Sequence, residues 1–253
     1  MPRHRAIRRF NDNSTKKAPV LTPKQLKRLL FVAGDTRNPE RNQLIVWLLF
    51  AAAFRITEVA VIEIKDVMWK SGKLRNKVVI PAKYCKNGKA GHVFFYHKKL
   101  LKALEAYIQH RIEKRLQMAS PVSSDYRGLR KDSKLILSEN KHAYSLKRKK
   151  RVYNDEETGK DIHKDHWACD TLQNVVSKWG REAGIKGFTT HSGRRTLATR
   201  IARRGGDERL ICTLLRHTTE DTIYEYIDPD FDGIRKTLEA LYSLPDDEID
   251  TTL

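Results

Sequence analysis

Apolar side chains recur at intervals of three and four along most of the chain, which is the period of an amphipathic helix. The first such segment begins with Thr22, Pro23 and Gln25. They supply a capping hydroxyl, a proline at the first helical position and a glutamine three residues after the cap. This combination is typical of the N-terminus of a helix. Helices are predicted over about 22–32, 40–53, 58–64 (capped by Thr57), 98–116, 167–179, 194–201 and 208–215.

Two short segments have the composition of strands rather than helices. Val78–Ile80 and Val93–Tyr96 are β-branched or aromatic, and Asn87-Gly88 between them is a strong hairpin signal. They predict a small antiparallel sheet, so the fold class is α+β and mostly helical. Residues 119–165 are polar and weakly patterned, and we expect a long loop or insertion there.

The length of 253 residues allows one large domain or two small ones, and a hydrophobic share of 40% is enough to build a core. Residues 1–20 are predicted to be a basic flexible arm. A single domain is expected over 21–242, with a basic insertion at about 119–165 that contains the run 147–151. Residues 243–253 form an acidic tail.

Lysine and arginine total 50 against 31 acidic residues, a formal net charge of +19. Such a balance favours polyanionic partners, with nucleic acid first among them. Three widely separated cysteines do not predict a disulfide framework. No segment has the apolar length of a signal or membrane span, so we expect a cytoplasmic protein without a membrane partner.

Arginines and a histidine at two places could bind an anion. Arg55 follows Phe54 in a break between two apolar helices, where a guanidinium needs an anionic partner. That partner is either a carboxylate, Glu58 or Glu63, or a phosphate. His191 and Arg194 are three residues apart at a helix start and could reach one phosphate there.

Together with the segment around His217, these strings resemble the catalytic domain of the tyrosine recombinase (integrase) family over about 21–235. Phe54-Arg55-Ile56-Thr57-Glu58 resembles the string of its first arginine, with Ala53 where glycine is usual. His191 to Arg194 resembles its His-x-x-Arg box. His217 resembles the histidine of its leucine-glycine-histidine box, with Arg216 in place of glycine. The implied catalytic residues are Arg55, Lys86, His191, Arg194, His217 and Tyr226, with Lys83 and Lys89 as rivals of Lys86, and Tyr224 as the rival of Tyr226.

The resemblance implies a site-specific DNA recombinase that cuts and rejoins strands through a 3′-phosphotyrosine, in integration, excision or inversion of a mobile element. Arg55 and Arg194 would clamp the phosphate and His217 would hydrogen-bond it. Tyr226 would be the nucleophile, His191 its base and Lys86 the acid for the leaving oxygen. No metal or cofactor is implied.

The implied partners are double-stranded DNA and further copies of the chain, in a tetramer on DNA held partly by exchange of a C-terminal helix, for which 231–242 is the candidate. Accessory DNA-bending proteins are left open. Only about twenty residues precede the expected catalytic domain, so we expect the basic arm and insertion to supply phosphate contacts. The alternatives are a type IB topoisomerase, a non-catalytic DNA-binding regulator of the same fold, and a basic RNA-binding protein.

Overall fold

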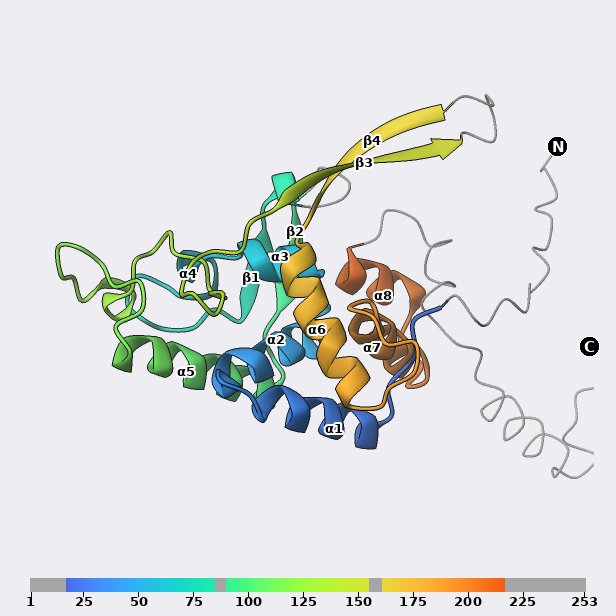
Figure 1. Ribbon diagram of the computed structural model, residues 1–253, viewed down its shortest axis with the longest axis horizontal. Coiled ribbons are helices and arrows are strands. Elements are labelled where there is room, and N and C mark those ends of the chain that lie inside the picture. Colours follow the sequence, from blue (N-terminus) through green and yellow to red (C-terminus); the bar gives the residue numbers. More distant parts are fainter. Residues whose placement is uncertain (1–16, 85–89, 155–160, 217–253) are drawn as a thin grey trace, which may run out of the picture.

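The computed structural model describes residues 17–84, 90–154 and 161–216 (Figure 1). Within these ranges two small antiparallel sheets accompany a mainly helical body, so the fold is α+β as predicted. The elements are α1 (Pro23–Gly34), α2 (Pro39–Ala51), α3 (Ile56–Val61), α4 (Ile64–Val67), β1 (Lys77–Ile80), β2 (Gly91–Phe94), α5 (Lys98–Glu113), β3 (Lys147–Asn154), β4 (Asp161–Ala168), α6 (Asp170–Glu182), α7 (Ser192–Ala202) and α8 (Glu208–Leu215).

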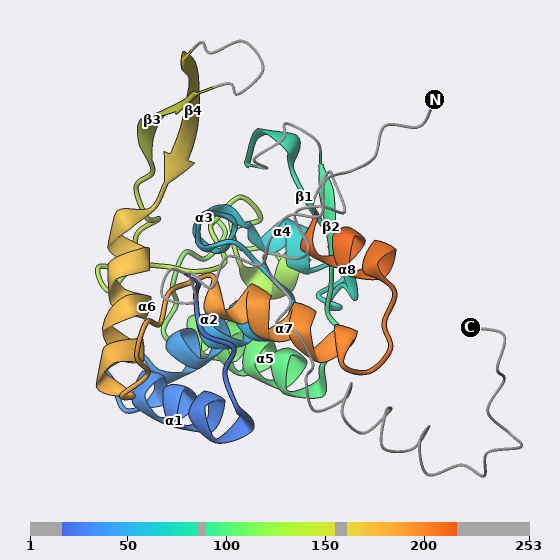
Figure 2. The same ribbon diagram turned by 90° about the vertical axis from the view of Figure 1, so that its right-hand side faces the viewer.

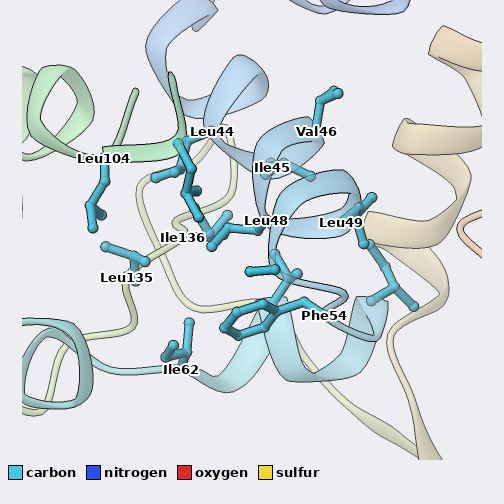
Figure 3. Close-up of a cluster of buried hydrophobic side chains, with 14 of the residues drawn as sticks. Leu44, Ile45, Val46, Leu48, Leu49, Phe54, Ile62, Leu104, Leu135 and Ile136 are labelled. Carbon is cyan, nitrogen blue, oxygen red and sulfur yellow. The ribbon is translucent and has the colours of Figure 1, made fainter. Parts of the chain in front are cut away.

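Helix α2 is the centre of the core, because its sequence is apolar on almost every side. Helices α1, α5 and α7 all pack against it. Figure 3 shows side chains of α2 meeting Phe54 after its end, Leu104 of α5, and Leu135 and Ile136 of the segment before β3. These contacts leave the C-terminal end of α2 in the middle of the molecule.

The start of α1 has the predicted capping box. Thr22 Oγ1 accepts a hydrogen bond from the backbone N–H of Gln25, and the Gln25 side chain accepts one from the Thr22 N–H. Next to it, the backbone N–H of buried Leu21 donates to Thr196 Oγ1 on α7 at 2.9 Å. This hydrogen bond links the start of α1 to α7, two elements that are far apart in the sequence.

Strands β1 and β2 form the predicted antiparallel pair, with Val78 opposite Val93. Val78, Ile80 and Val93 are buried, whereas Val79 between them is half exposed. This alternation is that of a sheet with one face on the core. Helix α8 lies against β2, so the hairpin and the last described helix are neighbours.

Helix α3 begins two residues earlier than the sequence predicts, and Thr57 is not its cap. Arg55 holds the capping position, and its backbone N–H donates to the Glu58 carboxylate at 2.7 Å. A carboxylate accepts a stronger hydrogen bond than a hydroxyl, and it also complements the positive end of the helix dipole. The prediction at Thr57 was wrong because a buried Glu58 satisfies the orphan N–H instead.

The prediction of a long loop over 119–165 was wrong in its second half. Strands β3 and β4 pair antiparallel over eight residues each, with Lys147 opposite Ala168 and Asn154 opposite Asp161. Cations are depleted in strands, so a run of lysine and arginine gives little strand signal. Figures 1 and 2 both show the β3–β4 ribbon standing away from the helical body above α6.

Among the helices that the structure describes, none combines the length and the apolar composition needed to cross a bilayer.

Candidate active site

The chain changes direction sharply after α2, and the change occurs at Ala53. Ala53 is buried and has φ of 51°, in the left-handed region, and the next N–H, of Phe54, returns to the Leu48 carbonyl at 3.1 Å. A left-handed conformation costs an L-residue about 1–2 kcal/mol, a cost that glycine avoids. Ala53 therefore bears a conformational strain at the position where the resembled family uses glycine.

Arg194 reaches this break from α7. Its side chain is wholly buried, Nη1 donates to the Ala53 carbonyl at 2.6 Å, and Nη2 donates to the carbonyl of Leu215 at the end of α8. The preceding Gly193 makes this approach possible, because a Cβ there would lie 2.5 Å from the Leu49 carbonyl oxygen of α2. Arg194 thus joins the C-terminal ends of α2 and α8.

Arg216 reaches the same carbonyl from the other side. It caps α8 in a left-handed conformation, with φ 54° and ψ 49°. Its Nη2 donates to the Ala53 carbonyl at 3.0 Å and to Glu58 Oε2 at 2.5 Å. The Ala53 oxygen therefore accepts hydrogen bonds from two guanidinium groups.

Glu58 lies beside these arginines and is the carboxylate that pairs with Arg55. The Glu58 carboxylate is wholly buried, and its Oε1 accepts a hydrogen bond from Arg55 Nη1 at 2.9 Å. Glu63, the other candidate, instead pairs with Lys134 at 2.6 Å and Lys65 at 2.7 Å. One buried carboxylate thus holds two arginines, and we call Arg55, Arg194 and Arg216 with Glu58 the arginine cluster.

The arginine cluster gathers cationic side chains around one buried carboxylate and one carbonyl oxygen. Arg55 and Arg216 donate to the Glu58 carboxylate, and Arg194 and Arg216 donate to the Ala53 carbonyl. Arg55 is the most accessible member, with 18% of its side chain exposed. An anion such as a phosphate that approached the arginine cluster would therefore meet Arg55 first.

His191 lies at the N-terminal end of the helix that carries Arg194. It occupies the capping position of α7 and is exposed, and its backbone N–H donates to Thr189 Oγ1 at 3.1 Å. The spacing of three residues does place His191 and Arg194 on one turn. Their environments differ, however, because Arg194 is turned into the protein and His191 faces the surface.

The remaining residues of the expected site lie outside the described residues. These are Lys86, His217 and Tyr226, together with the rivals Lys89 and Tyr224. The structure therefore brings together Arg55 and Arg194 and places His191 on the same helix as Arg194. The catalytic roles of all six residues stay predictions.

In the sequence, Arg216 stands out only as a departure from a glycine, and no local pattern assigns it a contact. The available signal was an arginine at a position that favours glycine, two residues after the apolar Leu214 and next to His217. A charged side chain at such a position needs a specific partner. The structure identifies that partner as Glu58.

The chain matches the phage integrase family over residues 19–232. This match covers most of the chain, and the protein therefore belongs to the phage integrase family. Among curated relatives, the tyrosine recombinase XerA of Pyrococcus horikoshii is 26% identical over 221 residues, which are 87% of this chain and 60% of the relative. XerA of Thermococcus kodakarensis is also 26% identical, over 87% of this chain and 61% of the relative. The chain thus spans less than two thirds of the length of these relatives.

Solved structures share the fold at lower identity. A crystal structure of XerA recombinase has a TM-score of 0.59 and 21% identity, over 90% of this chain and 65% of its own. The XerH recombinase bound to its palindromic difH substrate has a TM-score of 0.57 and 19% identity, over 88% of this chain and 53% of its own. The Tn1549 transposon integrase, in complex with a circular intermediate DNA, has a TM-score of 0.56 and 16% identity, over 91% and 68%. These likenesses establish the architecture of the helical body.

Proposed function

We propose that this protein is a site-specific DNA recombinase, which cleaves and rejoins DNA through a 3′-phosphotyrosine during integration, excision or inversion of a mobile element. The observation that carries the proposal is the arginine cluster. Arg55 and Arg194 are far apart in the sequence, and the fold holds Arg55 on Glu58 and Arg194 on the Ala53 carbonyl, with Arg216 bridging these two acceptors. They are the two arginines that the family resemblance assigns to the scissile phosphate.

In the proposed reaction the Tyr226 hydroxyl oxygen attacks the scissile phosphorus, and the bond from phosphorus to the 5′ oxygen breaks. His191 accepts the phenol proton, and Lys86 gives a proton to the departing 5′ hydroxyl. The phosphodiester is exchanged for a phosphotyrosyl ester of similar energy. Rejoining by another 5′ hydroxyl therefore needs no external energy source.

The arginine cluster would supply the electrostatic part of this catalysis. Negative charge grows on the non-bridging phosphate oxygens as the tyrosine attacks, and guanidinium groups bind such oxygens bidentately. Arg55, the most exposed member, is assigned the first contact with the phosphate. Arg194 is covered in the free chain, so we expect DNA binding to open the cluster before Arg194 reaches the same phosphate. His217 would donate a further hydrogen bond.

We further propose that the chain works on double-stranded DNA as a tetramer in the cytoplasm. Relatives of the same fold are recombinases bound to DNA, among them a lambda integrase dimer on a core site. The body also has an apolar groove of about 160 Å³, which could receive the helix expected at 231–242 of a neighbouring copy. The groove is lined by Ala51, Ala52, Ala53, Val93, Phe94, Tyr96, His97, Leu197, Ile201 and Leu214.

The proposal is tested by trapping the covalent intermediate. Purified protein is incubated in EDTA with labelled duplex DNA from beside its own gene, nicked near the cleavage position so that the cut fragment diffuses away. A denaturing gel should show a protein–DNA band. We expect Tyr226→Phe to abolish this band, because the attacking oxygen is lost, and Tyr224→Phe to retain it.

Two results would contradict the proposal in different ways. A band lost in Tyr224→Phe but retained in Tyr226→Phe would assign the nucleophile to Tyr224. If selected high-affinity duplexes are bound but never yield a covalent band, the protein is a DNA-binding regulator of this fold and not a recombinase.

A further inference from the structure

The β3–β4 ribbon has two rows of side chains, because successive residues of a strand point to opposite faces. The backbone register places Lys149 opposite His166 in one row, next to Lys147. In the other row Arg148 is opposite Trp167, and Lys150 is opposite Asp165. The first four cations of β3, Lys147 to Lys150, are all exposed. Cationic side chains are therefore presented on both faces of one projecting element.

The sequence of β3 does not favour the ribbon by itself. Lysine and arginine are poor strand formers, adjacent like charges repel, and an isolated two-stranded hairpin is marginally stable in water. Two carboxylates offset part of this charge, since Arg148 pairs with Asp165 and Lys149 with Asp170. In the part of the chain that the structure describes, no carboxylate lies within ion-pair distance of Lys147 or Lys150.

The ribbon also exposes apolar surface beside its cations. Trp167 is 50% exposed and Val152 is 52% exposed, and both lie in the row that contains Lys150. An exposed tryptophan next to lysine gives a surface that can contact sugar and base edges while the cations bind phosphates. A purely solvated charged loop would not need this apolar component.

We propose that the β3–β4 ribbon is a duplex-DNA-binding arm, which contacts phosphates outside the cleavage position and takes no part in strand cleavage. This inference rests on the proposed function, because it assumes that the polyanion is DNA. A two-stranded ribbon fits the major groove, which is about 12 Å wide. Eight strand residues extend about 26 Å at 3.3 Å each, so the arm reaches DNA well beyond the helical body.

The test compares two pairs of lysines with equal charge. Lys147→Gln with Lys150→Gln removes two ribbon cations that have no described ion pair. Lys24→Gln with Lys27→Gln removes two exposed lysines of α1, which lies at the end of the body opposite to the ribbon in both views (Figures 1 and 2). Binding of each protein to a fluorescent 30-base-pair duplex is measured by anisotropy at several salt concentrations.

The ribbon variant should bind about tenfold more weakly near physiological salt. Its slope of log K against log salt should be shallower by about 1.8, because each phosphate contact contributes about 0.9. The α1 variant should bind within about twofold of the parent chain with an unchanged slope. At saturating protein the ribbon variant should still form the covalent band, because the arm is assigned to binding alone.

Three outcomes overturn the inference, and they separate it from the proposed function. Equal slopes for the ribbon and α1 variants would show that the ribbon makes no phosphate contact, although the protein binds DNA. Altered sedimentation of the DNA-free ribbon variant, with unchanged DNA affinity, would make the ribbon a contact between copies of the chain. A parent chain that binds no duplex at all would refute the proposed function as well.

Discussion

Two residues of the arginine cluster and its surroundings, Arg216 and Ala53, have the left-handed backbone that glycine adopts most easily. Each is expected to cost about 1–2 kcal/mol relative to glycine. The Arg216 guanidinium donates a charged hydrogen bond to buried Glu58 and another hydrogen bond to the Ala53 carbonyl. The side chain thus compensates for a conformation that its own backbone disfavours.

This compensation predicts an unusual order of stability at position 216. Arg216→Ala loses the hydrogen bonds to Glu58 and Ala53 and keeps the left-handed strain, and we expect the free energy of unfolding to fall by about 3 kcal/mol. Arg216→Gly loses the same bonds but relieves the strain, so it should be about 1 kcal/mol more stable than Arg216→Ala. Urea unfolding of the three proteins measures the order. Equal stability of the two variants would show that the backbone at 216 is not strained.

His97 gives the fold a dependence on pH. Burial lowers the pKa of His97 below its ordinary value of 6.5, and the positive charges of Lys99 and Arg200 lower it further. The unfolded chain then binds more protons than the folded one, so the free energy of unfolding should fall as the pH drops below about 6.5. The ring also stacks on Trp47, with 4.9 Å between the ring centroids.

The control for this dependence is His97→Phe, which keeps an aromatic ring but cannot take up a proton. Unfolding at pH 7 and at pH 5.5 should show a larger loss of stability for the parent chain than for His97→Phe. NMR titration should place the His97 midpoint below its ordinary value of 6.5. A midpoint above its ordinary value would mean that the folded chain is stabilised, and not destabilised, when His97 takes up a proton.

At the scale of the elements, the contact of α2 with α7 positions Arg194. Gly193→Ala would place a methyl group 2.5 Å from the Leu49 carbonyl oxygen, so the helices must separate. Overpacking of this kind costs about 1–3 kcal/mol, and we expect about 2–3 kcal/mol for Gly193→Ala in urea unfolding. Gly205→Ala is the control, because it meets no atom within 4 Å and has only its φ of 75° against it.

We expect Gly205→Ala to cost about 1 kcal/mol, for conformational reasons alone. Since Gly193 is next to Arg194, Gly193→Ala should also weaken the covalent DNA band. If Gly193→Ala were no more destabilising than Gly205→Ala, the close approach of α2 and α7 would not be important for stability.

Elements whose signals are local could be predicted from the sequence. The capping box at Thr22, the β1–β2 sheet and the amphipathic α5 each depend on residues close together in the chain. The β3–β4 ribbon could not be predicted, because its pairing joins strands of low β-propensity. The family strings pointed to Arg55 and Arg194, which the fold brings near each other, and their catalytic roles stay predictions. The bond from Arg216 to Glu58 joins residues 158 apart, and no local pattern reports it.

At the scale of the whole molecule, the cations behind the net charge of +19 lie in two different environments. Some of them are buried in the arginine cluster, where water and salt screen them little. The ribbon cations are exposed at one end of the body, where salt screens them over about 8 Å at physiological ionic strength. Under the proposed function, the first set acts on one phosphate, and the second binds a long polyanion in a salt-sensitive way.

The Ala53 carbonyl has a consequence for how such a site can evolve. It is part of the main chain, so no single substitution at position 53 can delete the oxygen that Arg194 and Arg216 share. An alanine scan would not reveal this oxygen, although Arg194 of α7 and Arg216 at the end of α8 both donate to it. Only chemistry on the backbone itself, such as replacing the amide before Phe54 with an ester, would weaken this acceptor and expose its contribution.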